Sequence, residues 1–308
     1  MSNGVPRRLI DELVNRWTLG GLKATFVEGS NDQRLIRLLQ REPHCPKGLE
    51  DLDPIPTEAV EISPDLLQKH GLESTGAKQR VIAVSREVLE RGAADGFRGI
   101  VDIDLDRILG KDVRSDVTVY TDYSCMDCYL WTVHVFNRIL IQFRCEGSVS
   151  GADEEKTLFD SISIVCRELT IARVINERHR EWNLDLHKSE KCLSLKNKLV
   201  SIDINSYLLQ CKPPKSALEG LKRLPSEIRK ELSQLAVLDT INGHDLVWVL
   251  TYCLRELSTM SRRLIDEETV RNSLLAFGIS NVEVGGAALF RQLAVWQSAG
   301  LEADQGRA

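Results

Sequence analysis

The sequence predicts an α/β protein in which a mostly parallel sheet flanked by helices is followed by a mainly helical half. Up to residue 121, short segments rich in β-branched and aromatic residues alternate with amphipathic helical segments. Strands separated by helices are typical of parallel sheets. Past Gly151 the apolar residues follow helical spacing. We therefore divide the 308 residues into an α/β domain, 1–150, and a helical domain, 151–308.

The elements of the first half follow from local patterns. Strands are expected at residues 22–27, 58–62, 98–104 and 117–121. The second of these lies in a proline-rich, acidic stretch that is otherwise irregular. Asn31 or Asp32 is placed to cap a first helix, and valines and a leucine at helical spacing predict a second one over residues 78–91.

The second half contains five predicted helices, at residues 158–172, 216–235, 244–257, 267–277 and 287–296. Residues 156–230 hold 15 basic and 9 acidic side chains, which is a local excess of six positive charges. Two interpretations of this stretch stay open: a solvated helical surface, or a face that binds a nucleic-acid backbone.

Composition excludes some classes of protein. With 40 Lys and Arg against 45 Asp and Glu, the net charge of −5 excludes the basicity of a histone. There is no apolar run long enough for a membrane helix, and the first residues lack the apolar segment of a secretory signal. We expect a cytoplasmic protein with reduced cysteines and no membrane partner. The Cys125-x-x-Cys128 pair lacks a second zinc-ligand pair, so we interpret it as half-buried and structural.

The most informative residues are carboxylates near strand ends. Asp102, Asp104 and Asp106 follow an apolar strand, and alternate residues of an extended chain point to the same side. Asp102 and Asp104 would then lie together, where they repel one another and raise each other's proton affinity. A divalent cation relieves this repulsion, and oxygen ligands suit Mg²⁺. The alternative is a solvated loop in which Asp106 caps the next turn.

Glu28 strengthens the metal interpretation because it ends the first predicted strand and precedes Gly29, which allows close approach of a ligand. Ligands of open α/β sheets bind outside the carboxyl ends of the strands. Glu28 would therefore converge with Asp102 and Asp104. For Asp32 we favour helix capping over metal binding.

A third group of acids follows the strand at 117–121. Asp122 would extend the same acidic crevice, and Asp127 would cap or enter the following helix. A turn with a helix cap explains both residues equally well.

Two motifs and their separation resemble the TOPRIM fold, the metal-binding core shared by topoisomerases, primases and overcoming-lysogenisation-defect nucleases. The motifs are Phe26-Val27-Glu28-Gly29-Ser30-Asn31-Asp32 and Asp102-Ile103-Asp104. The chain is more similar to the TOPRIM-like effectors of bacterial anti-phage systems, as in the effector subunit of PARIS systems. That resemblance extends to Thr121-Asp122, Asp127-Cys128-Tyr129-Leu130 and, in a helical second half, Asn242-Gly243-His244-Asp245-Leu246.

The resemblance implies roles for individual residues. Glu28 would be the acid/base carboxylate, and Asp102 and Asp104 would bind Mg²⁺, with Mn²⁺ as a substitute. Asp106 or Asp122 would complete the ligand set. Asp127 stands where these effectors commonly carry glutamate, so its side chain is one methylene shorter. The role of His244 and Asp245 does not follow from the motif, and a helix N-terminus with Asp245 complementing the dipole explains them.

The function implied is Mg²⁺-dependent cleavage of nucleic-acid phosphodiesters by the toxic effector of an anti-phage defence system. The resemblance implies RNA, and within RNA tRNA, as the target. It also implies a separately encoded ATPase that senses infection. This chain has no Walker A motif, so sensing that is driven by ATP would need another protein. The sequence is compatible with a homo-oligomer and does not define one.

Two other functions remain open at this stage. One is a non-catalytic, TOPRIM-like interaction module whose acids are merely solvated. The other is a metal-dependent phosphatase or phosphotransferase, since Asp-x-Asp after a strand also serves such enzymes. That enzyme would need Asp102 as nucleophile and a supporting lysine, for which Lys111 is the only near candidate in the sequence.

Overall fold

The computed structural model describes residues 8–20, 23–72, 76–111 and 115–299. The chain forms two compact units that interleave along the sequence. The first unit comprises Met1–Ile103, Asp112–Asp122 and Ile279–Ala308, and the second comprises Asp104–Lys111 and Tyr123–Gly278. The boundaries of these units differ from the single boundary that we placed at residue 150. The division into two domains at that residue stays a prediction.

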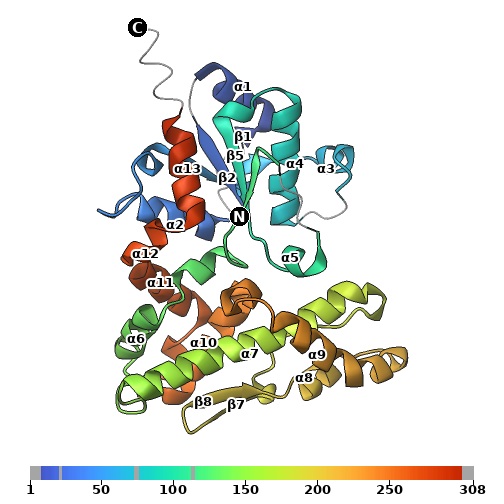
Figure 1. Cartoon of the computed structure of the whole chain (residues 1–308), viewed down its shortest axis with the longest axis vertical. Coiled ribbons are helices and arrows are strands. Elements are labelled where there is room, and N and C mark those ends of the chain that lie inside the picture. The colour runs from blue at the N-terminus through green and yellow to red at the C-terminus, as the bar shows by residue number, and fades with distance from the viewer. Residues whose placement is uncertain (1–7, 21–22, 73–75, 112–114, 300–308) are drawn as a thin grey trace. The chain divides into compact units, whose positions relative to one another are not determined.

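The first unit is built on a four-stranded parallel sheet with helices around it, which confirms the predicted α/β class (Figure 1). The strand order is β3-β2-β5-β6. Their bounds are Ala24–Val27 for β2, Asp53–Pro56 for β3, Phe97–Val101 for β5 and Thr118–Tyr120 for β6. A separate parallel pair joins β1, Arg8–Leu9, to β4, Val60–Glu61.

The two central strands bring their carboxyl ends to the same edge of the sheet. β2 and β5 pair in parallel with Ala24 opposite Phe97 and Phe26 opposite Gly99. Continued by two residues, this register brings Glu28 opposite Val101 and next to Asp102. This register positions the candidate site.

The helices of the first unit cover the sheet and complete its core. They are α1, Ile10–Gly20; α2, Ser30–Leu39; α3, Pro64–Lys69; α4, Ala77–Glu90; α12, Val282–Gly285; and α13, Ala288–Ser298. The valines of α4 pack with Phe26 and Phe97 in one fully buried cluster. Gly99 on β5 allows the close approach of α4, because a Cβ there would lie 2.3 Å from Ser85 Oγ.

Strand β3 is an element that the sequence pattern did not reveal. Its residues Asp53–Pro56 lie in the acidic, proline-rich stretch and pair with β2 at the edge of the sheet. Prolines are tolerated on an edge strand because one side of that strand needs no ladder hydrogen bonds. The short strand expected at residues 58–62 is present as β4, after the 3-10 helix η2, Thr57–Ala59.

The strand before the aspartates is shorter than the sequence predicts. β5 ends at Val101, whereas we expected it to continue to residue 104. Asp104 adopts a φ of 43°, in the left-handed region. The alternation of an extended strand therefore does not orient Asp102 and Asp104, and that part of the sequence argument is wrong.

The second unit is mainly helical, as predicted. Its helices are α5, Asp106–Leu109; α6, Val133–Gln142; α7, Ala152–Arg178; α8, Ile204–Gln210; α9, Leu218–Leu232; α10, Gly243–Leu257; and α11, Glu267–Gly278. The long helix α7 contacts α9, α10 and an unpredicted antiparallel hairpin (Figure 1). That hairpin consists of β7, Leu193–Lys196, and β8, Leu199–Ile202.

The Cys-x-x-Cys pair lies at the start of the 3-10 helix η4, Met126–Leu130. Cys125 and Cys128 are both buried rather than half-buried, and their sulfur atoms are 3.5 Å apart. Within the described parts of the chain, no helix is both long and apolar enough to cross a membrane.

Candidate active site

Glu28 and Asp102 meet at the carboxyl edge of the first unit's sheet. Glu28 follows β2 directly, and its Oε1 accepts a hydrogen bond of 2.9 Å from the backbone N–H of Asp102, which follows β5. The Glu28 carbonyl also accepts a bond of 2.6 Å from Thr57 Oγ1. Backbone and side chain of Glu28 are therefore both held, next to the backbone of Asp102. The convergence of the Glu28 carboxylate with those of Asp102 and Asp104 stays a prediction.

Helix α2 begins immediately after Glu28. Gly29 is its N-cap residue, and the Gly29 N–H donates to Asp32 Oδ2 at 2.9 Å. This bond gives Asp32 a capping role, as we favoured, but the N-cap residue is Gly29 rather than Asn31 or Asp32. A second carboxylate lies close by, since a Cβ on Gly29 would be 3.7 Å from Glu58 Oε1. The surroundings of Glu28 are therefore rich in carboxylate oxygens.

Lys78 places a positive charge at the same edge of the sheet. It lies in the first turn of α4, and its Nζ is 3.5 Å from the carbonyl oxygen of Ile103 and 5.8 Å from the centre of the Tyr120 ring. Sequence reasoning missed Lys78 because it considered lysines close to the aspartates in the chain, where Lys111 was the only near candidate. Lys111 instead lies 3.5 Å from Glu177 in the second unit.

Asp122 follows β6 and caps a distant helix. Its Oδ2 accepts a 3.0 Å hydrogen bond from the backbone N–H of Leu289, in the first turn of α13. A carboxylate is favourable at a helix N-terminus because it satisfies a donor and complements the helix dipole. This contact occupies one carboxylate oxygen, and metal binding by Asp122 stays a prediction.

Asp104 and Asp106 belong to the second unit. The Asp104 N–H donates to the Ser124 carbonyl at 2.8 Å, and Asp104 lines a cavity of about 20 Å³ with Ser124 and Asp239. A cavity of this size holds about one water molecule. Asp106 is the first residue of α5, whose N-cap residue is Leu105 and which has no side-chain cap bond, so the alternative in which Asp106 caps this turn is wrong.

Asp127 is engaged by an arginine. Arg271 Nη1 donates to Asp127 Oδ2 at 2.8 Å, and Arg271 Nη2 lies 3.4 Å from His244 Nδ1. Burial raises the pKa of the Asp127 carboxyl, although the charges of Arg271 and His244 act in the opposite direction. Gly243 lets α10 approach this pair, because a Cβ there would lie 2.4 Å from Asp127 Oδ2.

The Asn242–Asp245 segment forms the start of α10 and holds the side chain of Arg173. Asn242 Oδ1 accepts from the His244 N–H at 3.0 Å, so it caps the helix. Asp245 is buried and forms a two-pronged ion pair with Arg173, both distances being 2.7 Å. Burial alone would lower the pKa of Arg173, but the hydrogen bonds and charge of Asp245 raise it, and the charge of Asp104 acts in the same direction. A helix start with Asp245 in the first turn describes this segment, as we expected.

The basic stretch of residues 156–230 is largely neutralised by nearby acids. At least nine of its basic side chains form ion pairs: Lys156, Arg173, Arg178, Arg180, Lys188, Lys212, Lys222, Arg223 and Arg229. Exposed ion pairs contribute little stability, but they do reduce the field available to attract a phosphate backbone. This pairing favours the solvated-surface interpretation of the stretch.

Comparisons with known proteins add no family assignment. Neither the models of protein families nor the curated protein sequences match this chain.

Proposed function

We propose that this protein is a Mg²⁺-dependent nuclease that cleaves phosphodiester bonds at the carboxyl edge of the first unit's sheet. One observation supports the proposal most directly: the Glu28 carboxylate contacts the backbone of Asp102, from the neighbouring strand end. Two carboxylate residues from different strands thus share the place where open α/β sheets bind ligands.

The residues present fit a magnesium ion. Glu28 and Asp102 offer carboxylate oxygens, and Glu58 adds another carboxylate close to Gly29. Mg²⁺ prefers oxygen ligands and is usually held by one or two carboxylates together with substrate phosphates. Asp102 would hold the ion, the sequence-based proposal adds Asp104 as a second ligand, and Glu28 keeps the acid/base role. When bound, the ion neutralises phosphate charge and favours an attacking oxygen nucleophile.

The protein's own side chains supply the other parts of the reaction. Glu28 is placed to accept a proton from the attacking hydroxyl or water, and its bonds to Asp102 and Thr57 fix its position. Lys78 places an ammonium group near the Ile103 carbonyl, where it would attract a substrate phosphate.

The finer parts of the proposal rest on the resemblance to TOPRIM-like effectors. They are RNA and in particular tRNA as substrate, a toxic role in anti-phage defence, a separately encoded ATPase that restrains the effector, and action in the cytoplasm. A nuclease toxic to its own cell requires restraint, which gives the ATPase partner a physical reason.

A metal-dependent phosphatase or phosphotransferase is the second candidate, and Lys78 favours it. Such an enzyme needs a cation beside its nucleophilic aspartate. Lys78 lies at the same strand end as Asp102, whereas Lys111 lies beside Glu177 in the second unit. The two functions share the metal and differ in the size of the substrate.

The test is an activity assay on purified protein with mixed tRNA, plasmid DNA and a small phosphate ester, each with Mg²⁺, Mn²⁺ or chelator. We expect metal-dependent cutting of RNA, reduced by about 10²- to 10⁴-fold in Glu28→Gln because a positioned acid/base group contributes that much. Asp102→Asn should lose activity as well.

Glu61→Gln is the matched control, because Glu61 is exposed on β4 and should keep full activity. Release of phosphate from the ester without RNA cutting would select the phosphatase. RNA or partner binding without any turnover, with the proposed ATPase partner also supplied, would support the interaction module and contradict the nuclease.

A further inference from the structure

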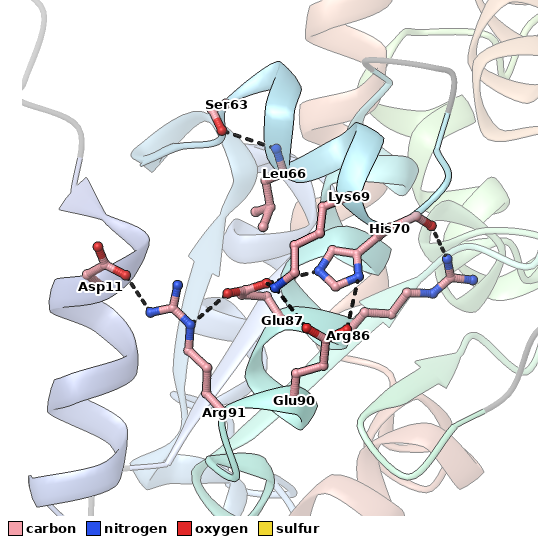
Figure 2. Close-up of polar contacts among 9 residues, drawn as sticks. All are labelled: Asp11, Ser63, Leu66, Lys69, His70, Arg86, Glu87, Glu90 and Arg91. Atoms are coloured by element: carbon pink, nitrogen blue, oxygen red, sulfur yellow. Dashed lines mark hydrogen bonds and ion pairs between the residues drawn. The ribbon is translucent and has the colours of Figure 1, made fainter.

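A second group of metal-ligating side chains lies where α3 ends beside α4, among residues the proposed nuclease reaction does not use. His70 is the C-cap residue of α3, and Glu87 and Glu90 lie one turn apart near the end of α4. Figure 2 shows all three side chains pointing toward one another, with the Lys69 side chain reaching into the same space. One potential ligand atom from each of the three lies within 4.8 Å of the others.

The distances define a position for a cation between these side chains. His70 Nε2 is 3.0 Å from Glu87 Oε2, and His70 Nδ1 is 3.7 Å from Glu90 Oε1. Lys69 Nζ lies 2.6 Å from Glu87 Oε2 and 2.8 Å from Glu90 Oε2. A positive charge therefore already bridges the two carboxylates, and the imidazole contacts one of the bridged oxygens.

Burial makes this group different from a surface cluster of acids. The side chains of His70 and Glu87 are only 4% and 5% exposed, while those of Lys69 and Glu90 are about half exposed. A buried carboxylate requires neutralisation. Arg91 Nε binds the other Glu87 oxygen, Oε1, at 2.7 Å, so Oε2 is the oxygen turned toward the cation position. Lys69 has a flexible, solvent-exposed stem that can leave this position without disturbing the core.

The surrounding contacts hold the ligands in place. Arg86 Nη1 donates to the His70 carbonyl at 2.6 Å, and Ser63 Oγ caps α3 by accepting from the Leu66 N–H. Arg91 is itself held by Asp11 on α1 (Figure 2). Hydrogen bonds from surrounding residues orient metal-binding side chains and tune the affinity of a site for its metal.

We propose that His70, Glu87 and Glu90 form a binding site for a divalent transition-metal ion of the zinc class, and that the Lys69 ammonium competes with the metal for the two carboxylates. The imidazole selects against Mg²⁺ and Ca²⁺, which take oxygen ligands, and one nitrogen with two carboxylates suits Zn²⁺, Co²⁺ or Mn²⁺. The bound ion would join the end of α3 to α4. It is a structural site, separate in residues from Glu28 and Asp102.

The experiment is a titration of the full-length protein with Co²⁺, followed by its visible absorption and by calorimetry. With excess Mg²⁺ present to occupy the proposed site at Asp102, we expect one saturable Co²⁺ ion that Zn²⁺ displaces. Glu90→Gln and His70→Gln should each weaken binding by at least about tenfold. Lys69→Gln should tighten binding about two- to fivefold, because an exposed ion pair no longer competes. Saturating Zn²⁺ should also raise the thermal unfolding temperature of the wild type.

Glu90→Gln is the decisive variant because Glu90 is largely exposed and the substitution should leave the fold intact. Glu28→Gln is the control that separates the two sites, and it should bind Co²⁺ as the wild type does. Absence of saturable Co²⁺ binding in both wild type and Lys69→Gln would overturn the proposal. Equal binding by wild type and Glu90→Gln would overturn it too, as would no gain in Lys69→Gln.

Discussion

Several buried or half-buried carboxylates of this protein are held by cationic side chains from other parts of the chain. Glu87 is paired with Lys69 and Arg91, and Asp127 is paired with Arg271. Breaking one partner of such a buried pair leaves an uncompensated charge, which is costly. The network around Glu87 therefore has a measurable consequence for stability, even without a metal ion.

Glu87 should make the stability of the protein dependent on pH in the acid range. Burial alone would raise its pKa, but hydrogen bonds from Lys69, Arg91 and His70 outweigh this and lower the pKa from 4.5 to about 2. The ionised carboxylate therefore stabilises the fold above about pH 4.5, and this contribution is lost as the pH falls toward 2. We expect a loss of about 1–3 kcal/mol in unfolding free energy.

Denaturant unfolding of metal-free protein between pH 6 and the lowest pH at which it stays folded measures this effect. Glu87→Gln should be less stable than the wild type at pH 6 and should show a shallower pH dependence. An identical pH dependence in the variant would show that Glu87 is not the group responsible. Glu61→Gln, on an exposed residue, serves as the reference.

At the scale of single residues, the sequence predicted contacts between side chains and backbone groups that are close together in the chain. A capping role for Asp32 was predicted because Asp32 lies at the start of an apolar helical segment, although the N-cap residue itself is Gly29. The pairing of Asp127 with Arg271 joins residues 144 positions apart, and no local pattern carries that information. Asp122 is likewise committed to the N–H of Leu289, far along the chain.

The helices and strands themselves were largely predictable, because their apolar periodicity is local. The long helix α7 and the central strands β2 and β5 lie where the pattern placed them. The end of β5 was not predictable, because Asp102 and Asp104 continue an alternating pattern that the left-handed φ of Asp104 interrupts. A non-glycine residue in that conformation is uncommon, and such backbone strain clusters at functional sites.

Packing of α4 against β5 depends on the absence of a side chain at Gly99. A Cβ at this position would lie 2.3 Å from Ser85 Oγ and 2.8 Å from Val81 Cγ1, and both neighbours are fully buried. Gly99→Ala should therefore destabilise the protein by about 1–3 kcal/mol through overpacking. Thermal unfolding measures the loss, with Gly147→Ala as control because a Cβ there meets no atom within 4 Å.

Adding Ser85→Ala to the Gly99→Ala protein removes the closest clashing atom. The double variant should recover part of the lost thermal stability. If Gly99→Ala unfolds at the same temperature as the wild type, the close approach of α4 to β5 is not as described.

At the scale of the whole molecule, the chain leaves and re-enters its first unit. Helices α12 and α13 belong with the α/β unit, although they follow the helical half in sequence. Lys23, just before β2, contacts the Trp296 carbonyl, and Gly48 lies against the Ala294 carbonyl and Ser298. The last helix was predicted, but its place in the fold depends on contacts that a local pattern does not encode.

The candidate site could be predicted from the sequence only in part. Glu28 and Asp102 were expected to converge because parallel strands end at one edge, and their contact agrees with that reasoning. Lys78 and Glu58 were missed, since each reaches the edge from a different element. The group of His70, Glu87 and Glu90 was missed for a similar reason: its two parts are 17 residues apart and meet only when α3 folds back on α4.

The central claim is that a divalent ion binds at Asp102, beside the Glu28 carboxylate, and iron-mediated cleavage of the protein chain tests it most directly. Fe²⁺ substituted for Mg²⁺ generates radicals with ascorbate and peroxide, and these cut the backbone near the ion. In the His70→Gln protein, which lacks the second proposed metal site, we predict cuts close to residues 28 and 102 that excess Mg²⁺ suppresses and an added Asp102→Asn substitution weakens. Cuts confined to other regions, or unaffected by Mg²⁺, would contradict the proposed active site.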